Sequence, residues 1–204
     1  MKRLFIYGDS NTYGFDPFDF YVGRYPEDSI WPNIVQSKLK DTWEVTADGL
    51  NGREVPRSDG EFRRLEMRMR GACPPDLFAI MLGSNDYLVM GQPDADAVGG
   101  RMKSALTRIS ENIEAEKILL MAPPAMKILD AYGFGGGMFM GADTSDGSLS
   151  EAYRKVADEI GCLFLDTLPW NIPVTADGVH FSEEGHAVFA DRVTEYLNGI
   201  DISE

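Results

Sequence analysis

The sequence is poor in several features on which whole classes of protein depend. It has two cysteines, Cys73 and Cys162, and two histidines among 204 residues. Two cysteines make no disulfide framework, so we expect inert thiols and a cytoplasmic protein. Two histidines exclude a histidine-rich metal site. No apolar run approaches the ~18 residues of a membrane-spanning helix, and the run at the N-terminus is too short for a secretory signal peptide.

Positive charge is also scarce. Nineteen Lys and Arg residues stand against 33 Asp and Glu, so the formal net charge is −14. Phosphate contacts need a basic surface, and this balance therefore argues against nucleic acid or an anionic membrane as a partner. Hydrophobic residues make up 44% and charged residues 25%, as in ordinary soluble globular proteins. The length predicts a single domain over residues 1–204.

Three familiar catalytic or binding motifs are missing. No G-x-x-x-x-G-K-[ST] occurs, which excludes a P-loop, and no G-x-S-x-G occurs, which excludes the nucleophile elbow of α/β-hydrolases. The glycine-rich run that starts at Gly133 has Met138 where a dinucleotide fingerprint needs its third glycine. The chemistry must therefore be sought in other residues.

Short apolar runs alternate with longer stretches of helical period, which predicts repeated βα units around a parallel sheet. The expected strands are Arg3–Tyr7, Trp43–Ala47, Leu77–Leu82, Lys117–Met121 and Cys162–Leu165. The expected helices are Trp31–Leu39, Glu61–Met69, Ala95–Asn112, Leu149–Ile160 and Ser182–Leu197. We expect Ser182 to cap the last helix, and Ser148 or Ser150 to cap the one before it.

Five almost wholly apolar strands imply burial on both faces of the sheet. The fold class is therefore α/β, a three-layer α/β/α sandwich of flavodoxin-like type with a five-stranded parallel sheet. In such sheets the ligand site lies beyond the carboxyl ends of the strands, where the strand order reverses. The residues directly after each expected strand are the ones to inspect.

Four short motifs occupy such positions. They are Gly8-Asp9-Ser10-Asn11, Gly49-Leu50-Asn51-Gly52, Gly83-Ser84-Asn85-Asp86 and, before the last helix, Asp177-Gly178-Val179-His180. Each alone is weak, because Gly, Asn and Asp form many turns. Together, in this order, they resemble the GDSL esterases, also called SGNH hydrolases, over nearly the whole chain. The stretches GDSNTYG, GLNGR, MLGSND and DGVHF are most similar to small bacterial arylesterases and acyltransferases.

The resemblance implies a catalytic triad of Ser10 as nucleophile, His180 as base and Asp177 as the group that orients the base. The competing interpretation of Ser10 is a helix N-cap, and that of Asp177 is a turn former before Gly178. His186 is the other histidine, and it lies inside an expected helix, where we interpret it as a surface or packing residue.

The resemblance also implies an oxyanion hole from the Ser10 N–H, the Gly52 N–H and the Asn85 side-chain amide. Gly49 is the alternative to Gly52, through a shift of register. We expect Asp9 to support the Ser10 turn by binding backbone amides. We expect no metal ion and no organic cofactor.

Other residues near these motifs have open roles. Tyr13, Phe15 and Trp31 line the substrate pocket or belong to the core. Arg53 and Arg57 contact a substrate carboxylate or belong to a solvated basic face with Arg63, Arg64, Arg68 and Arg70. Asp86 is expected to cap the turn after the third strand. The stretch Pro123–Gly147 has no sustained period, and it is a lid or pocket wall, or else an irregular surface loop or a contact within a homo-oligomer.

The resemblance implies a serine esterase that acts on small-molecule esters with short acyl chains, such as sugar or aryl acetates, through an acyl-enzyme. Acyl transfer to alcohols is a further expectation from the resemblance. The alternatives are a non-catalytic flavodoxin-like ligand-binding domain, and a phosphate or nucleotide binder, which the acidic composition disfavours.

Overall fold

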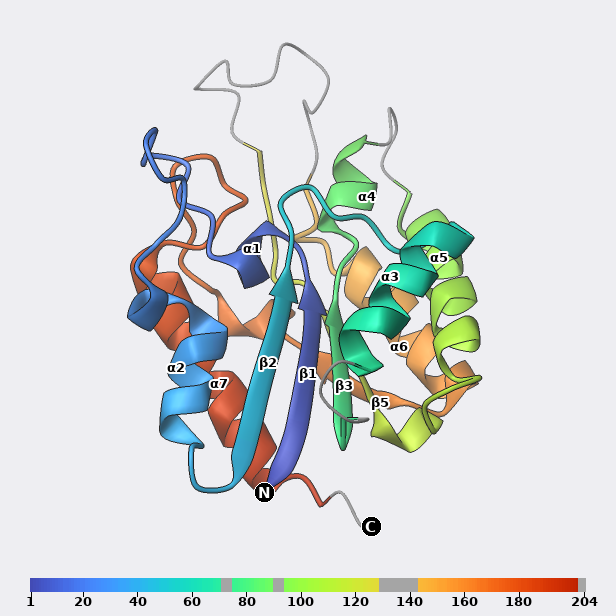
Figure 1. Ribbon diagram of the computed structural model, residues 1–204. Coiled ribbons are helices and arrows are strands. Elements are labelled where there is room, and N and C mark those ends of the chain that lie inside the picture. Colours follow the sequence, from blue (N-terminus) through green and yellow to red (C-terminus); the bar gives the residue numbers. More distant parts are fainter. Residues whose placement is uncertain (71–74, 90–93, 129–142, 202–204) are drawn as a thin grey trace.

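The computed structural model describes residues 1–70, 75–89, 94–128 and 143–201. In these residues five strands form one sheet in which every neighbouring pair is parallel (Figure 1). The strands are β1 Lys2–Gly8, β2 Trp43–Gly49, β3 Leu77–Met81, β4 Ile118–Ala122 and β5 Leu163–Asp166. Their order in space is β2-β1-β3-β4-β5, which is the flavodoxin-like order. The predicted parallel sheet is confirmed.

The long helices lie close to their predicted positions. They are α2 Trp31–Lys38, α3 Asp59–Arg70, α5 Ala95–Ile109, α6 Ser148–Ile160 and α7 Glu183–Gly199. The structure adds two short helices directly after strands, α1 Ser10–Tyr13 and α4 Ser84–Val89, and the 3₁₀ turns η1 Glu27–Ser29, η2 Ala115–Lys117 and η4 Leu168–Trp170. Periodicity did not predict them because four to six residues hardly exceed one helical turn.

Side chains that alternate along β1 build two separate hydrophobic cores. Leu4 and Ile6 pack with residues of α2 and α7, whereas Phe5 and Tyr7 pack with residues of α3, α5 and α6. Figure 1 shows these two groups of helices on opposite sides of the sheet. β3 and β4 are buried along their whole length. The three-layer sandwich is therefore as predicted.

The edge strand β2 differs from the prediction of five strands buried on both faces. Glu44, Thr46 and Ala47 are exposed, while Trp43 and Asp48 are buried. β2 pairs only with β1 and ends the sheet on that side, so part of its surface meets solvent. The prediction fails there because a parallel strand is fully buried only when neighbours cover it.

Helix capping follows the prediction at one helix and not at the other. The Ser182 hydroxyl accepts a backbone N–H of the first turn of α7 at 3.0 Å, as predicted. The prediction that Ser148 or Ser150 caps α6 is wrong. Gly147 precedes that helix, and the Ser148 N–H donates to the Asp146 carboxylate at 3.0 Å.

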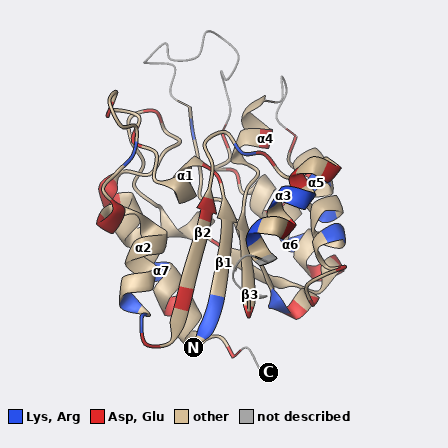
Figure 2. Cartoon of the chain, in the orientation of Figure 1, with Lys and Arg blue, Asp and Glu red and all other residues tan. Residues whose placement is uncertain are grey.

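Charged residues of both signs cover the helices. Lys and Arg gather on α3 and α5 (Figure 2), where Lys103 pairs with Glu159 at 2.5 Å and Arg108 pairs with Asp59 at 2.6 Å. The predicted solvated basic face of α3 is confirmed for its exposed residues Arg63, Arg64 and Arg68. None of the helices in the described ranges combines the length and apolarity needed to span a bilayer.

The strand order reverses between β1 and β3, because the chain passes from β1 to β2 on one side and later to β3 on the other. The loops after these three strands therefore meet at one edge of the sheet. Leu50, directly after β2, donates its N–H to the Gly8 carbonyl at the end of β1 at 3.2 Å. Three of the four sequence motifs lie in these loops.

Candidate active site

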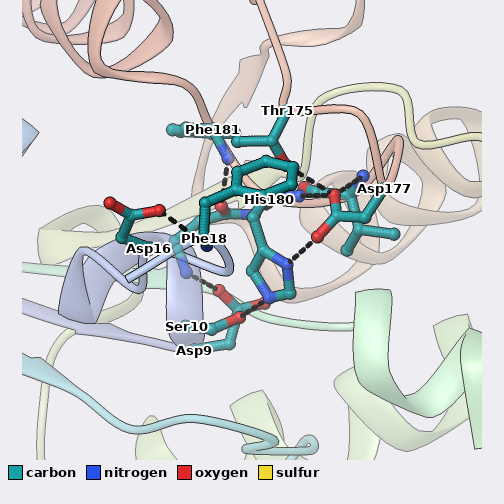
Figure 3. A network of polar contacts seen from close by, with 10 residues as sticks. Asp9, Ser10, Asp16, Phe18, Thr175, Asp177, His180 and Phe181 are labelled. Atoms are coloured by element: carbon teal, nitrogen blue, oxygen red, sulfur yellow. Dashed lines mark hydrogen bonds and ion pairs between the residues drawn. The ribbon is translucent and has the colours of Figure 1, made fainter. Parts of the chain in front are cut away.

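Ser10 is the first residue of α1 and follows β1 by one residue. The residue that caps this helix is Asp9, whose carboxylate accepts the Asn11 N–H at 3.0 Å. The interpretation of Ser10 as an N-cap is therefore wrong. The Ser10 hydroxyl is instead 3.1 Å from Nε2 of His180 (Figure 3). Asp9 binds a backbone amide beside Ser10, as predicted.

His180 and Asp177 lie in a tight turn between β5 and α7. The His180 carbonyl accepts the Thr175 N–H at 2.7 Å, which closes the turn. Gly178 has a φ of 76°, and a Cβ there would lie 1.8 Å from the Lys127 carbonyl oxygen. A residue with a side chain would be strained and would clash with backbone, so the turn requires glycine at this position.

The Asp177 carboxylate both shapes the turn and binds the imidazole. Its Oδ1 accepts the Val179 N–H at 2.9 Å, the His180 N–H at 3.0 Å and the Thr175 hydroxyl at 2.8 Å. Its Oδ2 lies 2.7 Å from Nδ1 of His180 (Figure 3). The two interpretations of Asp177, turn former and partner of His180, are therefore compatible.

This arrangement selects one tautomer of His180. A carboxylate accepts and does not donate, so the proton lies on Nδ1 and Nε2 is free to accept from the Ser10 hydroxyl. Burial alone would raise the pKa of Asp177, but the hydrogen bonds from the His180 side chain and backbone lower that pKa well below its usual range. Asp177 is thus an anion at neutral pH.

Asp9 is a buried carboxylate behind the Ser10–His180 contact. Its side chain is 2% exposed. Burial raises the pKa of Asp9 to about 6, against the opposing effects of the Asn11 N–H and of the nearby His180. Its carboxylate binds the backbone of α1 through the Asn11 N–H, so the geometry gives Asp9 a supporting role.

The residues predicted to bind an oxyanion follow β2 and β3. Gly52 is exposed with a φ of 72°, and a Cβ there would have open space around it. The Asn85 side chain donates one amide N–H to the Arg53 carbonyl at 3.0 Å, which leaves its second N–H available. Gly49, the alternative to Gly52, is the last residue of β2, and a Cβ there would lie 2.2 Å from the Tyr13 backbone nitrogen. Gly49 is therefore required for packing against α1.

Arg53 and Asp86 stabilise the segments that follow β1 and β2 by binding their backbone. The Arg53 guanidinium binds the Gly8 carbonyl at 2.9 Å and the Asp48 carboxylate at 3.0 Å, with its side chain 9% exposed. It is a structural residue and does not face a substrate carboxylate. The prediction that Asp86 caps the turn after β3 is wrong. It accepts the Val55 N–H at 2.8 Å and is paired with an arginine of α5 at 3.1 Å.

The aromatic residues predicted near the triad lie in different places, Phe15 beside His180 and Trp31 in the hydrophobic core. The ring of Phe15 meets His180 edge to face at 4.8 Å between centroids. Trp31 is fully buried in the core between α2 and α7 and so does not line the site. Tyr13 packs under the Arg24 guanidinium at 4.7 Å. His186 is fully buried, so its interpretation as a packing residue is confirmed.

The central part of the long loop Pro123–Gly147, residues 129–142, lies outside the described residues, and so does the predicted lid or subunit contact. Its two ends are joined by a bridge between Lys127 and Asp143, with an ion pair of 2.9 Å. The Lys127 N–H also donates to the Gly178 carbonyl at 2.9 Å. The base of this loop therefore supports the turn that carries Asp177.

Two observations bear on metals and thiols. Among the described residues, no three His, Cys, Asp or Glu side chains are grouped so that they could hold a metal ion. Cys162 is a free, half-buried thiol, and burial raises its pKa to about 11. Its predicted inertness agrees with that shift. Cys73 lies outside the described residues.

One residue of the site was missed by sequence reasoning. Asn11 was part of the first motif, but no role was predicted for it. Its side chain contacts the backbone on both sides of His180. The signal in the sequence was a polar residue directly after Ser10 in the first motif.

Comparisons with known proteins agree with this geometry. Residues 6–188 match the model of the GDSL-like Lipase/Acylhydrolase family. The GDSL lipase Rv0518 of Mycobacterium tuberculosis is 20% identical over 213 residues, which cover 97% of this chain and 82% of the relative. A carbohydrate acetylesterase family member from Sinorhizobium meliloti has 28% identity and a TM-score of 0.81, with 97% of this chain and 98% of that chain covered.

The inhibitor-bound aryl esterase of M. smegmatis has the same fold, with a TM-score of 0.83 at 21% identity over 98% of this chain and 100% of that chain. The enzyme interpretation is confirmed over the binding-domain alternative, because the matched family consists of ester hydrolases. Since the family model spans most of the sequence, from β1 into α7, this chain belongs to the GDSL-like lipase/acylhydrolase family of carboxylic ester hydrolases.

Proposed function

We propose that this chain is a serine esterase in which Ser10 is the nucleophile, His180 the general base and Asp177 the group that orients the base. The observation that carries the proposal is one continuous path of hydrogen bonds. It runs from the Ser10 hydroxyl to Nε2 of His180 at 3.1 Å, and from Nδ1 of His180 to Asp177 at 2.7 Å. Nucleophile, base and orienting group in hydrogen-bond reach are what acyl transfer requires.

In the first half of the reaction, the Ser10 Oγ attacks the ester carbonyl while Nε2 of His180 takes its proton. The imidazolium that forms is stabilised by the anionic Asp177. When the tetrahedral intermediate collapses, the C–O bond to the alcohol breaks and His180 returns the proton to the leaving oxygen. The product is an acyl-enzyme on Ser10.

The oxyanion of the tetrahedral intermediate requires hydrogen-bond donors. We assign the Ser10 N–H, the Gly52 N–H and the free N–H of the Asn85 amide to this role. Neither backbone N–H donates to another described residue. Gly52 follows β2, Asn85 lies at the start of α4 after β3, and the Asn85 side chain binds the carbonyl of Arg53, the residue next to Gly52. The Gly49 alternative is less favourable, because Gly49 packs against the backbone of α1.

The second half of the reaction consumes the acyl-enzyme. Water, activated by His180, releases the acid, and an alcohol in the same position would accept the acyl group instead. We propose hydrolysis as the principal outcome and acyl transfer to alcohols as a secondary one.

The substrates we propose are esters with short acyl chains, acetyl esters of sugars or aryl alcohols above all. Similarity to the carbohydrate acetylesterase family member from Sinorhizobium meliloti, at 28% identity over nearly the full length of both chains, supports the acetyl group. The Phe15 ring beside His180 offers an apolar surface against which an alcohol ring can pack.

The test is hydrolysis of p-nitrophenyl acetate, butyrate and octanoate by the wild type, Ser10→Ala and Ser104→Ala. Ser104 lies on the exposed side of α5 and is a matched control. We expect Ser10→Ala to lower kcat by about 10³-fold or more, Ser104→Ala to retain it, and acetate to be preferred. An unchanged rate in Ser10→Ala would overturn the proposal, and a preference for octanoate would overturn the proposed acyl specificity.

A further inference from the structure

The side chain of Asn11 holds the backbone on both sides of His180. Its Nδ2 donates to the Val179 carbonyl at 3.2 Å, and its Oδ1 accepts the Phe181 N–H at 2.8 Å. The two contacts span 168 and 170 residues of sequence. We propose that Asn11 is a positioning residue that sets the place of His180 relative to Ser10. This inference rests on the function proposed above.

The chemistry of the contact fits an amide and few other side chains. Asn carries a donor and an acceptor on one planar group, and here each faces its complement on the backbone. Asn11 is 7% exposed and Phe181 is 1% exposed. Because the site is buried, an apolar side chain in place of Asn11 would leave the Phe181 N–H without a partner.

Asn11 is anchored to the segment that carries the nucleophile. Its backbone N–H donates to the Asp9 carboxylate at 3.0 Å, and Ser10 lies between these two residues. The Asn11 amide then connects this rigid start of α1 to both neighbours of His180. A displacement of about 1 Å between nucleophile and base is enough to lower a rate by about 10²-fold.

Other contacts determine the conformation of the turn that carries Asp177 and His180 but do not connect this turn to α1. Asp177 accepts two backbone N–H groups inside the turn and so determines its internal form. Within the described ranges, the hydrogen bonds between the turn and α1 are the two made by Asn11 and the Ser10–His180 contact itself. The Phe15 ring adds an apolar contact with His180. Loss of the Asn11 amide should leave the turn folded but less firmly placed.

The chain contains a matched control for this contact. The Gln36 amide makes the same pair of bonds far from the site, donating to the Trp43 carbonyl at 3.0 Å and accepting the Val45 N–H at 2.6 Å. These bonds join α2 to the amino end of β2. Asn11→Leu and Gln36→Met are nearly isosteric, and each removes one donor and one acceptor from two backbone groups.

The experiment measures kcat and KM for p-nitrophenyl acetate, together with the midpoint of urea unfolding. The proteins are the wild type, Ser10→Ala, Asn11→Leu, Asn11→Ala and Gln36→Met. We expect Asn11→Leu to lower kcat by about 10- to 100-fold with KM within about twofold of wild type. Gln36→Met should keep kcat within about twofold of wild type. Its urea midpoint should fall by about as much as the urea midpoint of Asn11→Leu, because each variant removes one donor and one acceptor.

The outcomes separate the inference from the function on which it rests. A wild-type kcat in folded Asn11→Leu and Asn11→Ala would overturn the positioning role, and so would an equal loss of kcat in Gln36→Met. If neither Asn11 variant folds while Gln36→Met does, Asn11 is a stability residue and the inference is again wrong. Activity that persists in Ser10→Ala would instead overturn the proposed function.

Discussion

His186 makes the stability of this protein depend on pH in a way that can be measured. It lies in α7 and is fully buried between the rings of Tyr25 and Phe181. Its Nδ1 accepts the Trp31 N–H at 3.4 Å, and its Nε2 has no hydrogen-bond partner among the described residues. Burial lowers the pKa of His186 from 6.5 to about 4.

The sign and size of the effect follow from that shift. Above pH 6.5 the imidazole is neutral in both the folded and the unfolded state, so it adds no pH dependence. Between pH 6.5 and 4 the unfolded chain takes up a proton at His186 and the folded chain does not, so stability falls as the pH falls. The contribution of His186 to the free energy of unfolding should fall by about 2 kcal/mol between pH 7.5 and 5, and by about 3 kcal/mol once the pH is below 4.

Asp9 acts in the opposite direction. Its pKa is raised from 3.8 to about 6, so the folded state takes up a proton before the unfolded state as the pH falls. Its ionisation therefore destabilises the fold above pH 6, and that penalty is relieved between pH 6 and 4. The His186 effect must be isolated by comparing a variant with the wild type, because Asp9 is common to both.

The variant is His186→Asn, which keeps an acceptor near the position of Nδ1 and removes the titrating group. Urea unfolding is measured for wild type and variant at pH 7.5 and pH 5. The cavity left by the smaller side chain lowers stability equally at both pH values, so it cancels in the comparison. We expect the stability difference between the two proteins to shrink by about 2 kcal/mol at pH 5. A difference that is the same at both pH values would refute the reasoning.

Three further predictions concern the site. Asp177→Asn presents an amide N–H to Nδ1 of His180 and favours the wrong tautomer, so kcat should fall on the order of 10²–10⁴-fold with KM little changed; a near-wild-type kcat would remove Asp177 from the triad. Asn85→Ala should lower kcat for p-nitrophenyl acetate by on the order of 10²–10³-fold, and a change confined to KM would contradict its place in the oxyanion hole. Gly178→Ala should destabilise the protein in thermal unfolding more than Gly161→Ala, because both have positive φ, 76° and 78°, but only the first meets backbone; equal losses would contradict the clash.

The sequence predicted those parts of the fold that depend on residues close together in the chain, such as a hydrophobic period or a helix cap. The middle strands and long helices carry a period, and Ser182 caps α7 through a bond to its own first turn. α1 and α4 are too short to show a period. The exposure of β2 depends on which strand ends the sheet, and this is set by contacts between distant segments.

The same distinction applies to the site. Ser10, His180 and Asp177 were predicted because each lies in a short sequence motif that resembles a motif of a known family of esterases. Asn11 and Asp86 were not assigned their contacts, because the groups they bind are backbone atoms of segments far away in the sequence. Nothing in the residue types specifies such partners, since any exposed N–H or carbonyl could serve.

The central claim is that Ser10 is an activated nucleophile, and covalent labelling tests it most directly. The intact protein is treated with an alkyl fluorophosphonate, and the modified residue is located by mass spectrometry of its peptides. The structure predicts a single stoichiometric adduct on Ser10, at a rate that falls sharply when His180 is replaced by alanine because Nε2 no longer accepts the hydroxyl proton. Absence of labelling, or an adduct on another residue at the same rate in Ser10→Ala, would contradict the account.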